Sequence, residues 1–307
     1  MKTTKYYIAA ITAFVTWGLF SLVLRPIHDY PSLDILFFRV FSCSILMLLI
    51  AFLFKRKKIK ETIAIFKAMP KSEKRKSILL NIGGSAFLMA NWFTFIYAMN
   101  HVSIKAASLA YLVCPILTTL LAYFILKEKL LKTQWISVGL SISGCLLLSY
   151  TDIMDMLFSI VIGLTYAAYL VSQRANKNFD KFIVLTFHIT LAALFLVPFY
   201  PSYGGPVPTE FRFYFCIETI AILFTIVPLF LNLYALSGIN SSTVGMLLNI
   251  NPMIAFGLAA FVFKENITPL QITAYGIIFA AVLVFNSHHL FAIKQKYILS
   301  SKDSRQT

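Results

Sequence analysis

One arginine lies inside a long apolar run of this sequence. Arg39 stands about six residues into the run from 33 to 54, and a charged residue at the centre of a membrane-spanning helix costs about 2.5–3.5 kcal/mol. Asp34 lies five residues earlier, which is about 140° around a helix and therefore on a different face. Arg39 is near enough to the outer end of the run for snorkelling. We favour instead an inward side chain that binds a substrate anion or backbone carbonyls.

Aromatic, amide and imidazole side chains inside other apolar runs predict a cavity around this arginine. We expect its aromatic walls to be Trp17, Trp92 and Tyr166. Trp and Tyr also populate membrane interfaces, and a lone intramembrane histidine is most often a packing residue, so these alternatives stay open. The polar contacts predicted beside Arg39 are Asn91, Tyr111, His188 and Asn249.

Two prolines, Pro115 and Pro252, lie about a third of the way along their apolar runs. Each removes a helix donor and frees the carbonyl four residues earlier, at Tyr111 and Leu248. A packing kink that neighbouring helices accommodate is one interpretation. We favour bent helices that line the cavity, because the sequence repeats the proline in a duplicated stretch.

Patterns typical of catalysis or cofactor binding are missing from the sequence. It has no Gly-rich Walker loop for ATP hydrolysis. Asp152 and Asp155 form only a D-x-x-D pair, without the fuller acidic motif of a magnesium-dependent membrane transferase. The four cysteines fall inside apolar runs without paired spacing and are interpreted as packing residues. We therefore predict no catalytic residue, no metal site and no cofactor.

The elements that position these side chains are membrane helices. Of 307 residues, 59% are hydrophobic and 13% are charged, with a mean hydropathy of +0.80, whereas soluble domains carry roughly 25% charged residues. A spanning helix needs about 20 apolar residues. The sequence therefore predicts an all-α polytopic membrane protein with ten transmembrane helices, at about 6–24, 33–54, 77–98, 106–126, 133–150, 154–173, 181–200, 212–236, 242–263 and 269–287.

The basic residues indicate how these spans are oriented. The net charge is +15, and the segment 55–76 alone holds ten Lys and Arg residues. Cytoplasmic loops are enriched in Lys and Arg, and alternating sides from this segment place 22 of the 27 basic residues inside. We therefore predict two cytoplasmic termini and a lipid bilayer as partner, and no nucleic acid.

An internal duplication organises the chain. A shift of 137 residues superposes Pro115 on Pro252, Lys127 on Lys264 and Gln134 on Gln271, and a second, weaker shift of 149 superposes Trp17 on Tyr166 and Arg39 on His188. Five spans per half is an odd number, so the second half inserts inverted, as in secondary transporters. The predicted domains are a first repeat at 1–150, a second, inverted repeat at 151–290 and a cytoplasmic tail at 291–307.

Several short motifs in both halves match a known family. They include Asn91-Trp92, Tyr111, Pro115, Lys127-Glu128, Gln134-Trp135, Val227-Pro228, Asn251-Pro252, Lys264-Glu265 and Pro269-Leu270-Gln271. With these motifs the sequence resembles the EamA branch of the drug/metabolite transporter superfamily, and within it the RarD-like permeases. The resemblance implies two inverted five-helix EamA repeats around a central cavity with alternating access. It also implies that the fourth and fifth helices of each half form facing repeat ends or the contact of a homodimer.

We predict a multi-pass secondary transporter in the bacterial plasma (inner) membrane that exports a small organic metabolite or drug-like solute. An integral membrane enzyme and a non-transporting sensor or scaffold remain the alternatives. A polar-lined cavity between the halves favours the transporter over both.

Overall fold

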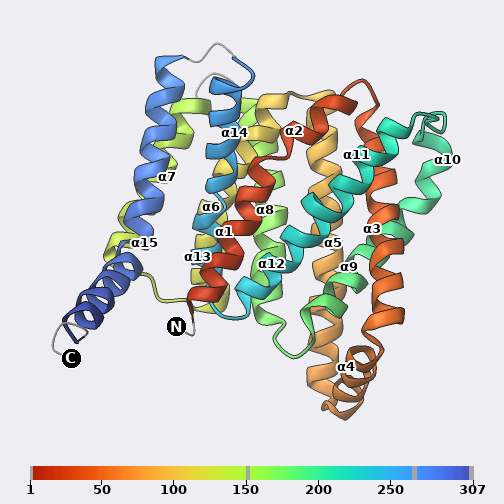
Figure 1. Cartoon of the computed structure of the whole chain (residues 1–307), viewed down its shortest axis with the longest axis horizontal. Helices are drawn as coiled ribbons and strands as arrows, with labels where there is room; N and C mark the ends of the chain where they lie inside the picture. The colour runs from red at the N-terminus through yellow and green to blue at the C-terminus, as the bar shows by residue number, and fades with distance from the viewer. Residues whose placement is uncertain (1–2, 150–152, 265–267, 304–307) are drawn as a thin grey trace.

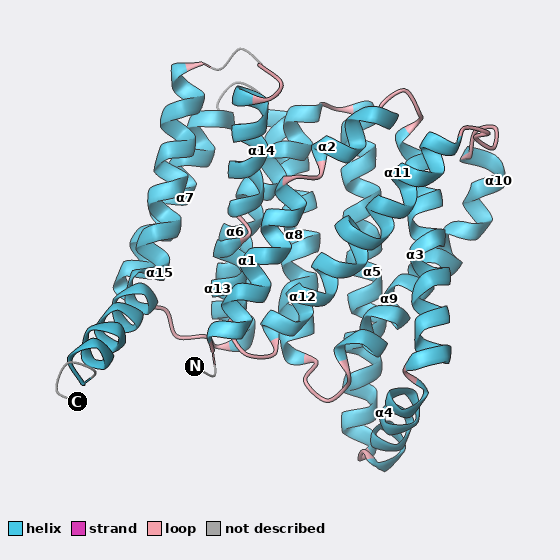
Figure 2. Cartoon of the chain, in the orientation of Figure 1, coloured by secondary structure: helices cyan, strands magenta, loops and turns pink. Residues whose placement is uncertain are grey.

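The computed structural model describes residues 3–149, 153–264 and 268–303, and these residues form a bundle of helices without strands (Figures 1 and 2). The predicted border at 150/151 lies outside the described residues. Helices follow from the apolar runs, because a backbone in lipid must satisfy its hydrogen bonds within its own segment. The helices are α1 (Thr4–Gly18), α2 (Ser21–Leu24), η1 (Arg25–Ile27), α3 (Ser32–Phe54), α4 (Arg56–Ala68), α5 (Lys71–His101), α6 (Ile104–Leu126), α7 (Lys132–Ser149), α8 (Ile153–Ala175), α9 (Lys181–Leu196), η2 (Val197–Phe199), α10 (Tyr200–Tyr203), α11 (Phe211–Ala221), η3 (Ile222–Ile226), α12 (Val227–Leu236), α13 (Ser241–Leu247), α14 (Ile250–Phe261) and α15 (Pro269–Asp303).

Nine helical segments within the described residues are long and apolar enough to cross a membrane. The tenth predicted span, α7, is also helical, but its 18 residues include Lys132, Gln134 and four serines, which lower its hydropathy. It lies along α15 at one edge of the bundle (Figure 1), and the Ser137 hydroxyl donates to the Ala281 carbonyl of α15 at 2.6 Å. Nine spans are therefore supported, and the tenth stays a prediction.

The starts of the helices repeat at the two spacings found in the sequence. Helices α13 and α15 begin at residues 241 and 269, which is 137 after the starts of α6 and α7 at 104 and 132. Helices α8 and α9 begin at 153 and 181, which is 149 after α1 and α3 at 4 and 32. The weaker of the two sequence shifts therefore has the same structural support as the stronger one.

The connections after α6 and α14 share an unusual backbone conformation. Lys127 has φ 55° and Lys264 has φ 54°, and among the described non-glycine residues only these two have positive φ. Seven residues later in each half a glutamine side chain accepts a backbone N–H: Gln134 from Leu131 at 2.9 Å and Gln271 from Thr268 at 2.8 Å. The left-handed residue ends one helix, and the glutamine caps the start of the next. The two halves therefore share the backbone conformation and the capping hydrogen bond of this connection, and not only their apolar composition.

The two halves interleave in space. The most extensive helix contacts, such as α6 with α8, α7 with α15, and α1 with α12, each join one half to the other. Small residues permit this close approach. A Cβ at Gly18 would lie 2.6 Å from the Ile254 Cβ of α14, and one at Gly245 would lie 2.7 Å from the Thr118 side chain of α6.

The basic segment after α3 is helical and marks one end of the bundle. Helix α4 and the first turns of α5 carry its Lys and Arg side chains, where the sequence alone suggested a loop. Figure 1 places α4, the start of α1 and the end of α15 at the same end. The prediction from charge assigns this end to the cytoplasm, and it is called the α4 end below.

Candidate functional site

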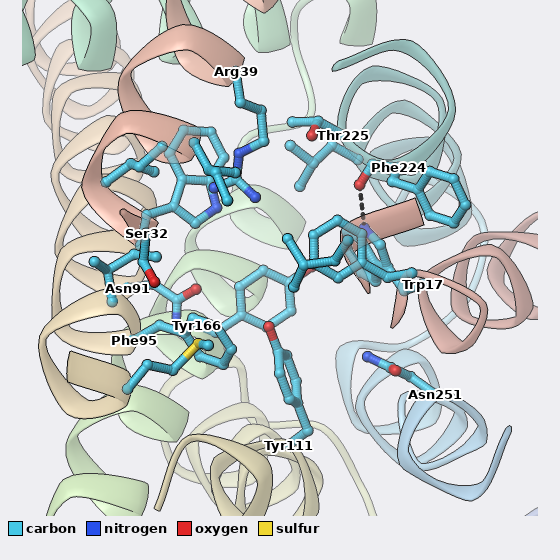
Figure 3. A pocket seen from close by; sticks show the side chains of 18 residues that line it. Trp17, Ser32, Arg39, Asn91, Phe95, Tyr111, Tyr166, Phe224, Thr225 and Asn251 are labelled. Carbon is cyan, nitrogen blue, oxygen red and sulfur yellow. Dashed lines mark hydrogen bonds between the residues drawn. The ribbon is translucent and has the colours of Figure 1, made fainter. Parts of the chain in front are cut away.

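A cavity of about 160 Å³ lies between the two halves (Figure 3). Helices α1, α3, α5 and α6 of the first half supply one part of its wall, and α8, η3, α12 and α14 of the second half supply the rest. Apolar and aromatic side chains make up most of the lining. Such a concave, mostly apolar pocket with few polar groups is typical of a small-molecule site.

Six of the eight predicted site residues meet at this cavity. His188 and Asn249 are the two that do not line it. Figure 3 shows Arg39 approaching from one side and Tyr111 from the opposite side, with Trp17 between them at the edge. The six lining residues are Trp17, Arg39, Asn91, Trp92, Tyr111 and Tyr166.

Arg39 has no counter-ion in the described part of the chain. Its guanidinium carbon lies 5.2 Å from the centroid of the Trp92 ring, which is a cation–π distance. Its Nε is buried and makes no hydrogen bond. Two nearby carboxylates have other partners: Asp34 of the same helix accepts the Gly205 N–H at 2.8 Å, and Glu218 of α11 accepts the Ser42 hydroxyl. Arg39, the first residue of the predicted site, therefore brings a positive charge to the cavity wall that no carboxylate of the described residues neutralises.

Trp17 is fixed by a bond that sequence reasoning did not anticipate. Its Nε1 donates to the Phe224 carbonyl at 2.8 Å, within the π-helical segment η3. Pro228 stands four residues after Phe224 and lacks the N–H that an α-helix would direct at this carbonyl. The Thr225 hydroxyl of the same segment donates to the Ile220 carbonyl of α11 at 3.0 Å. The Val227-Pro228 pair inside an apolar run was the available signal for this part of the wall.

Some of the other polar residues in the cavity wall are already hydrogen-bonded within the protein, and others are not. The Asn91 amide donates to the Ile162 carbonyl at 2.9 Å and so joins α5 to α8. The Tyr166 hydroxyl accepts from the Asn232 amide at 2.7 Å. Tyr111 and Asn251 line the cavity, and their side chains form no hydrogen bond within the described residues. Beside Arg39 and Ser32, these two are polar lining groups that remain available to a solute.

His188 and Asn249 lie in the packed interior and are fully buried. Within the described part of the chain, neither ring nitrogen of His188 has a hydrogen-bond partner, and its ring centroid lies 5.7 Å from that of Tyr169. The Asn249 amide donates to the Met246 carbonyl at 3.3 Å, at the break between α13 and α14. The structure therefore separates these two predicted residues from the cavity, and their contact with a solute remains a prediction.

A contact between the two halves lies at the α4 end of the bundle, and the cavity reaches toward the opposite end. Leu24, Ser32 and Met99 line the cavity on the opposite side, where Figure 1 places α2 and the start of α3. At the α4 end, the Glu128 carboxylate accepts the backbone N–H groups of Ser241 and Ser242 at 2.8 and 3.1 Å. This bond ties the hairpin of the first half to the start of α13 in the second.

Metal-binding chemistry has no support in the described residues. They contain no group of three or more His, Cys, Asp or Glu side chains placed to hold a metal ion. The four cysteines are buried, and none of them forms a disulfide.

Comparison with known proteins covers nearly the whole chain. The sequence model of the EamA-like transporter family matches residues 4–150 and 153–287. The chain is 26% identical over 290 residues to the uncharacterized transporter YojE of Bacillus subtilis (strain 168), with 92% of this chain and 94% of that protein covered. It is 25% identical over 276 residues to Protein RarD of Streptomyces exfoliatus, with 89% and 85% covered.

A solved crystal structure has the same fold. It superposes with a TM-score of 0.72 at 12% sequence identity, and covers 92% of this chain and 96% of that chain. At this identity the likeness concerns the fold alone.

Proposed function

The chain belongs to the EamA-like transporter family, and from this premise we propose that it carries a small organic solute across the bacterial inner membrane through the cavity between its halves. The multiple apolar helices and the transporter relatives make it a membrane transporter. The observation that carries the finer proposal is one cavity lined by both matched segments, with the unneutralised Arg39 at its wall.

The proposed solute is a small organic anion with a flat apolar body. An anionic group would supply the partner that Arg39 lacks, and a bidentate contact with a carboxylate or sulfonate suits a guanidinium. A cavity of about 150 Å³ holds benzene, so the 160 Å³ here admits roughly one ring. Aromatic walls such as Trp17 and Tyr166, whose ring centroids lie 6.0 Å apart, suit a flat apolar group.

The proposed mechanism is alternating access by ten helices with both termini in the cytoplasm, and the proposed direction is export, as the resemblance to the superfamily suggests. In this mechanism the Glu128 bond holds the α4 end closed while the cavity serves the opposite side. Because the most extensive helix contacts join one half to the other, we expect each rigid unit that moves to contain helices of both halves. Breaking a charge-assisted hydrogen bond costs about 1.5–3 kcal/mol, so the opposite state must form contacts of similar strength.

Binding of three single-ring probes tests the solute class: benzenesulfonate, its neutral analogue benzenesulfonamide, and the cation benzyltrimethylammonium. Quenching of tryptophan fluorescence in the purified protein reports binding, because two of the three tryptophans line the cavity. We expect benzenesulfonate to bind at least tenfold tighter than the other two. Arg39→Gln removes this preference and Arg39→Lys keeps part of it, whereas Arg75→Gln, at an exposed position of α5, leaves it unchanged.

Transport is measured separately, as counterflow of benzenesulfonate in proteoliposomes, because this permanent anion crosses bilayers slowly. Uptake that depends on the protein and falls at least tenfold in Arg39→Gln supports the proposal. Binding without transport would contradict the transporter function. Equal binding of the neutral probe would leave transport in place and overturn the anionic class.

A further inference from the structure

The residues that the first half contributes to the cavity wall have equivalents in the second half, and most of these equivalents are buried. Four residues that line the cavity are Trp17, Phe20, Leu36 and Arg39. The shift of 149 residues that relates the starts of α1 and α3 to those of α8 and α9 pairs these residues, in order, with Tyr166, Tyr169, Leu185 and His188.

Three of the four counterparts are sealed. Tyr169 is 1% exposed, and Leu185 and His188 are 0% exposed; none of them lines the cavity. If these residues served packing alone, their polar atoms would be paired, because a buried polar group without a partner loses its hydrogen bonds to water and gains none in return. Yet the Tyr169 hydroxyl and both ring nitrogens of His188 have no hydrogen-bond partner among the residues that the structure describes.

A glycine allows this cluster to close. Gly84 of α5 faces it, and a Cβ there would lie 2.3 Å from the Gln173 amide nitrogen and 3.1 Å from His188 Nε2. Gln173 is itself the counterpart of Leu24, another residue of the cavity wall. The polar atoms therefore gather where the inverted copy of the cavity would lie, with α5 pressed against them.

We propose that Tyr169, Gln173, Leu185 and His188 form a second solute site, which opens toward the α4 end when the present cavity closes. The inference rests on the proposed transport function. Its ligand is the same small organic anion, which receives hydrogen bonds from the Tyr169 hydroxyl, the Gln173 amide and an imidazole N–H of His188. In the open state, water and solute satisfy the Tyr169 hydroxyl and the His188 ring, which offsets the cost of leaving these two groups unpaired in the closed one. The Gln173 amide, which donates to the Leu80 carbonyl at 3.4 Å in the closed state, would exchange this bond for one to the solute.

Single cysteines test this opening in a protein whose four buried native cysteines are replaced by alanine. Leu185→Cys probes the proposed site, and Ile189→Cys, one turn further along α9 and also 0% exposed, is its matched control. Leu36→Cys and Val40→Cys form the equivalent pair on α3. The probe is an anionic, membrane-impermeant methanethiosulfonate, added to sealed vesicles of known orientation.

We expect Leu185→Cys to react from the α4 side at least ten times faster than Ile189→Cys, and saturating benzenesulfonate to slow the reaction. Leu36→Cys should react from the opposite side, and Val40→Cys from neither. Equal rates at 185 and 189 in vesicles that still transport benzenesulfonate would overturn the second site and leave the transporter standing. Fast modification at 185 without any transport would support the opening and contradict the transport function, and neither reaction nor transport would contradict both.

Neighbouring glycines supply a second test that leaves the cluster itself unchanged. Gly84→Ala places a methyl group against Gln173 and His188, so it should disfavour the closed packing and raise the reaction rate of Leu185→Cys severalfold. Gly83→Ala is the control, because the nearest atom to a Cβ there is 4.0 Å away, on Phe87. Equal rates in the two alanine variants would contradict the assignment of this cluster as the closed gate.

Discussion

The two proline-containing helices have related sequences and different conformations. Helix α6 continues through Pro115 from Ile104 to Leu126, whereas the equivalent segment breaks between α13 and α14, three residues before Pro252. In α6 the hydroxyls of Thr118 and Thr119 donate to carbonyls of their own helix at 2.8 and 2.9 Å. Proline alone therefore does not decide whether the helix stops.

Asparagine explains the break in the second half. Pro252 leaves the Leu248 carbonyl without its usual donor, and the Asn251 N–H takes it in a tighter turn at 3.0 Å. Asn249 bonds within the break through its amide, and asparagine competes well with regular helix pairing. The first half has Leu112 and Cys114 at these two positions. The break brings Asn251 to the cavity wall, where α6 presents Tyr111.

The starts of the two helices differ as well, and this is where the largest effect is expected. Helix α6 is capped locally, since the Ser103 hydroxyl accepts the Ala106 N–H at 2.9 Å, whereas α13 depends on Glu128 of the other half. Glu128→Ala should cost about 2–3 kcal/mol and lower the melting temperature in detergent by several degrees. Glu73→Ala, at an exposed position of α5, is the control, and equal melting temperatures would show that the bond adds no stability.

The break itself is tested by replacing Asn251 with cysteine, the residue that the first half has at the equivalent position. Asn251→Cys removes an amide from the cavity wall, so benzenesulfonate should bind roughly fivefold more weakly, for a hydrogen bond worth about 1 kcal/mol. Asn286→Cys is the matched control, because that amide bonds to the Val282 carbonyl of its own helix. Unchanged affinity in Asn251→Cys would mean that the break does not serve the site.

The smallest effect is expected at Pro115. Because α6 is already continuous, Pro115→Ala should change the unfolding free energy by only ~1 kcal/mol or less, as the new N–H reaches the Tyr111 carbonyl. A large loss of stability in thermal unfolding would instead show that Pro115 determines the packing of α6.

The sequence predicted the helices and their duplication because both depend on local composition and on residues such as Lys127 and Gln134 that recur in register. Six of the eight residues it predicted line the cavity, since a polar group inside an apolar run is costly and is therefore informative wherever it occurs. The sequence did not show that Arg39 lines the cavity whereas His188 is buried away from it. In a membrane protein the lipid-facing surface is as apolar as the packed interior, so the hydrophobic pattern does not indicate which face of a helix points inward. The π-helical segment at Phe224 depends on packing between helices that are distant in sequence.

The contact of Gly18 with Ile254 has a consequence for how the chain can vary. With a gap of 2.6 Å for any added Cβ, alanine at position 18 should be tolerated only when position 254 becomes smaller. A double-mutant cycle on Gly18→Ala and Ile254→Ala should therefore give a double variant more stable than the sum of the two single changes predicts. The two positions, 236 residues apart in the chain, are therefore expected to change together during evolution. The substitution of Ile254 by a smaller residue must come first, because only then does a side chain at position 18 fit.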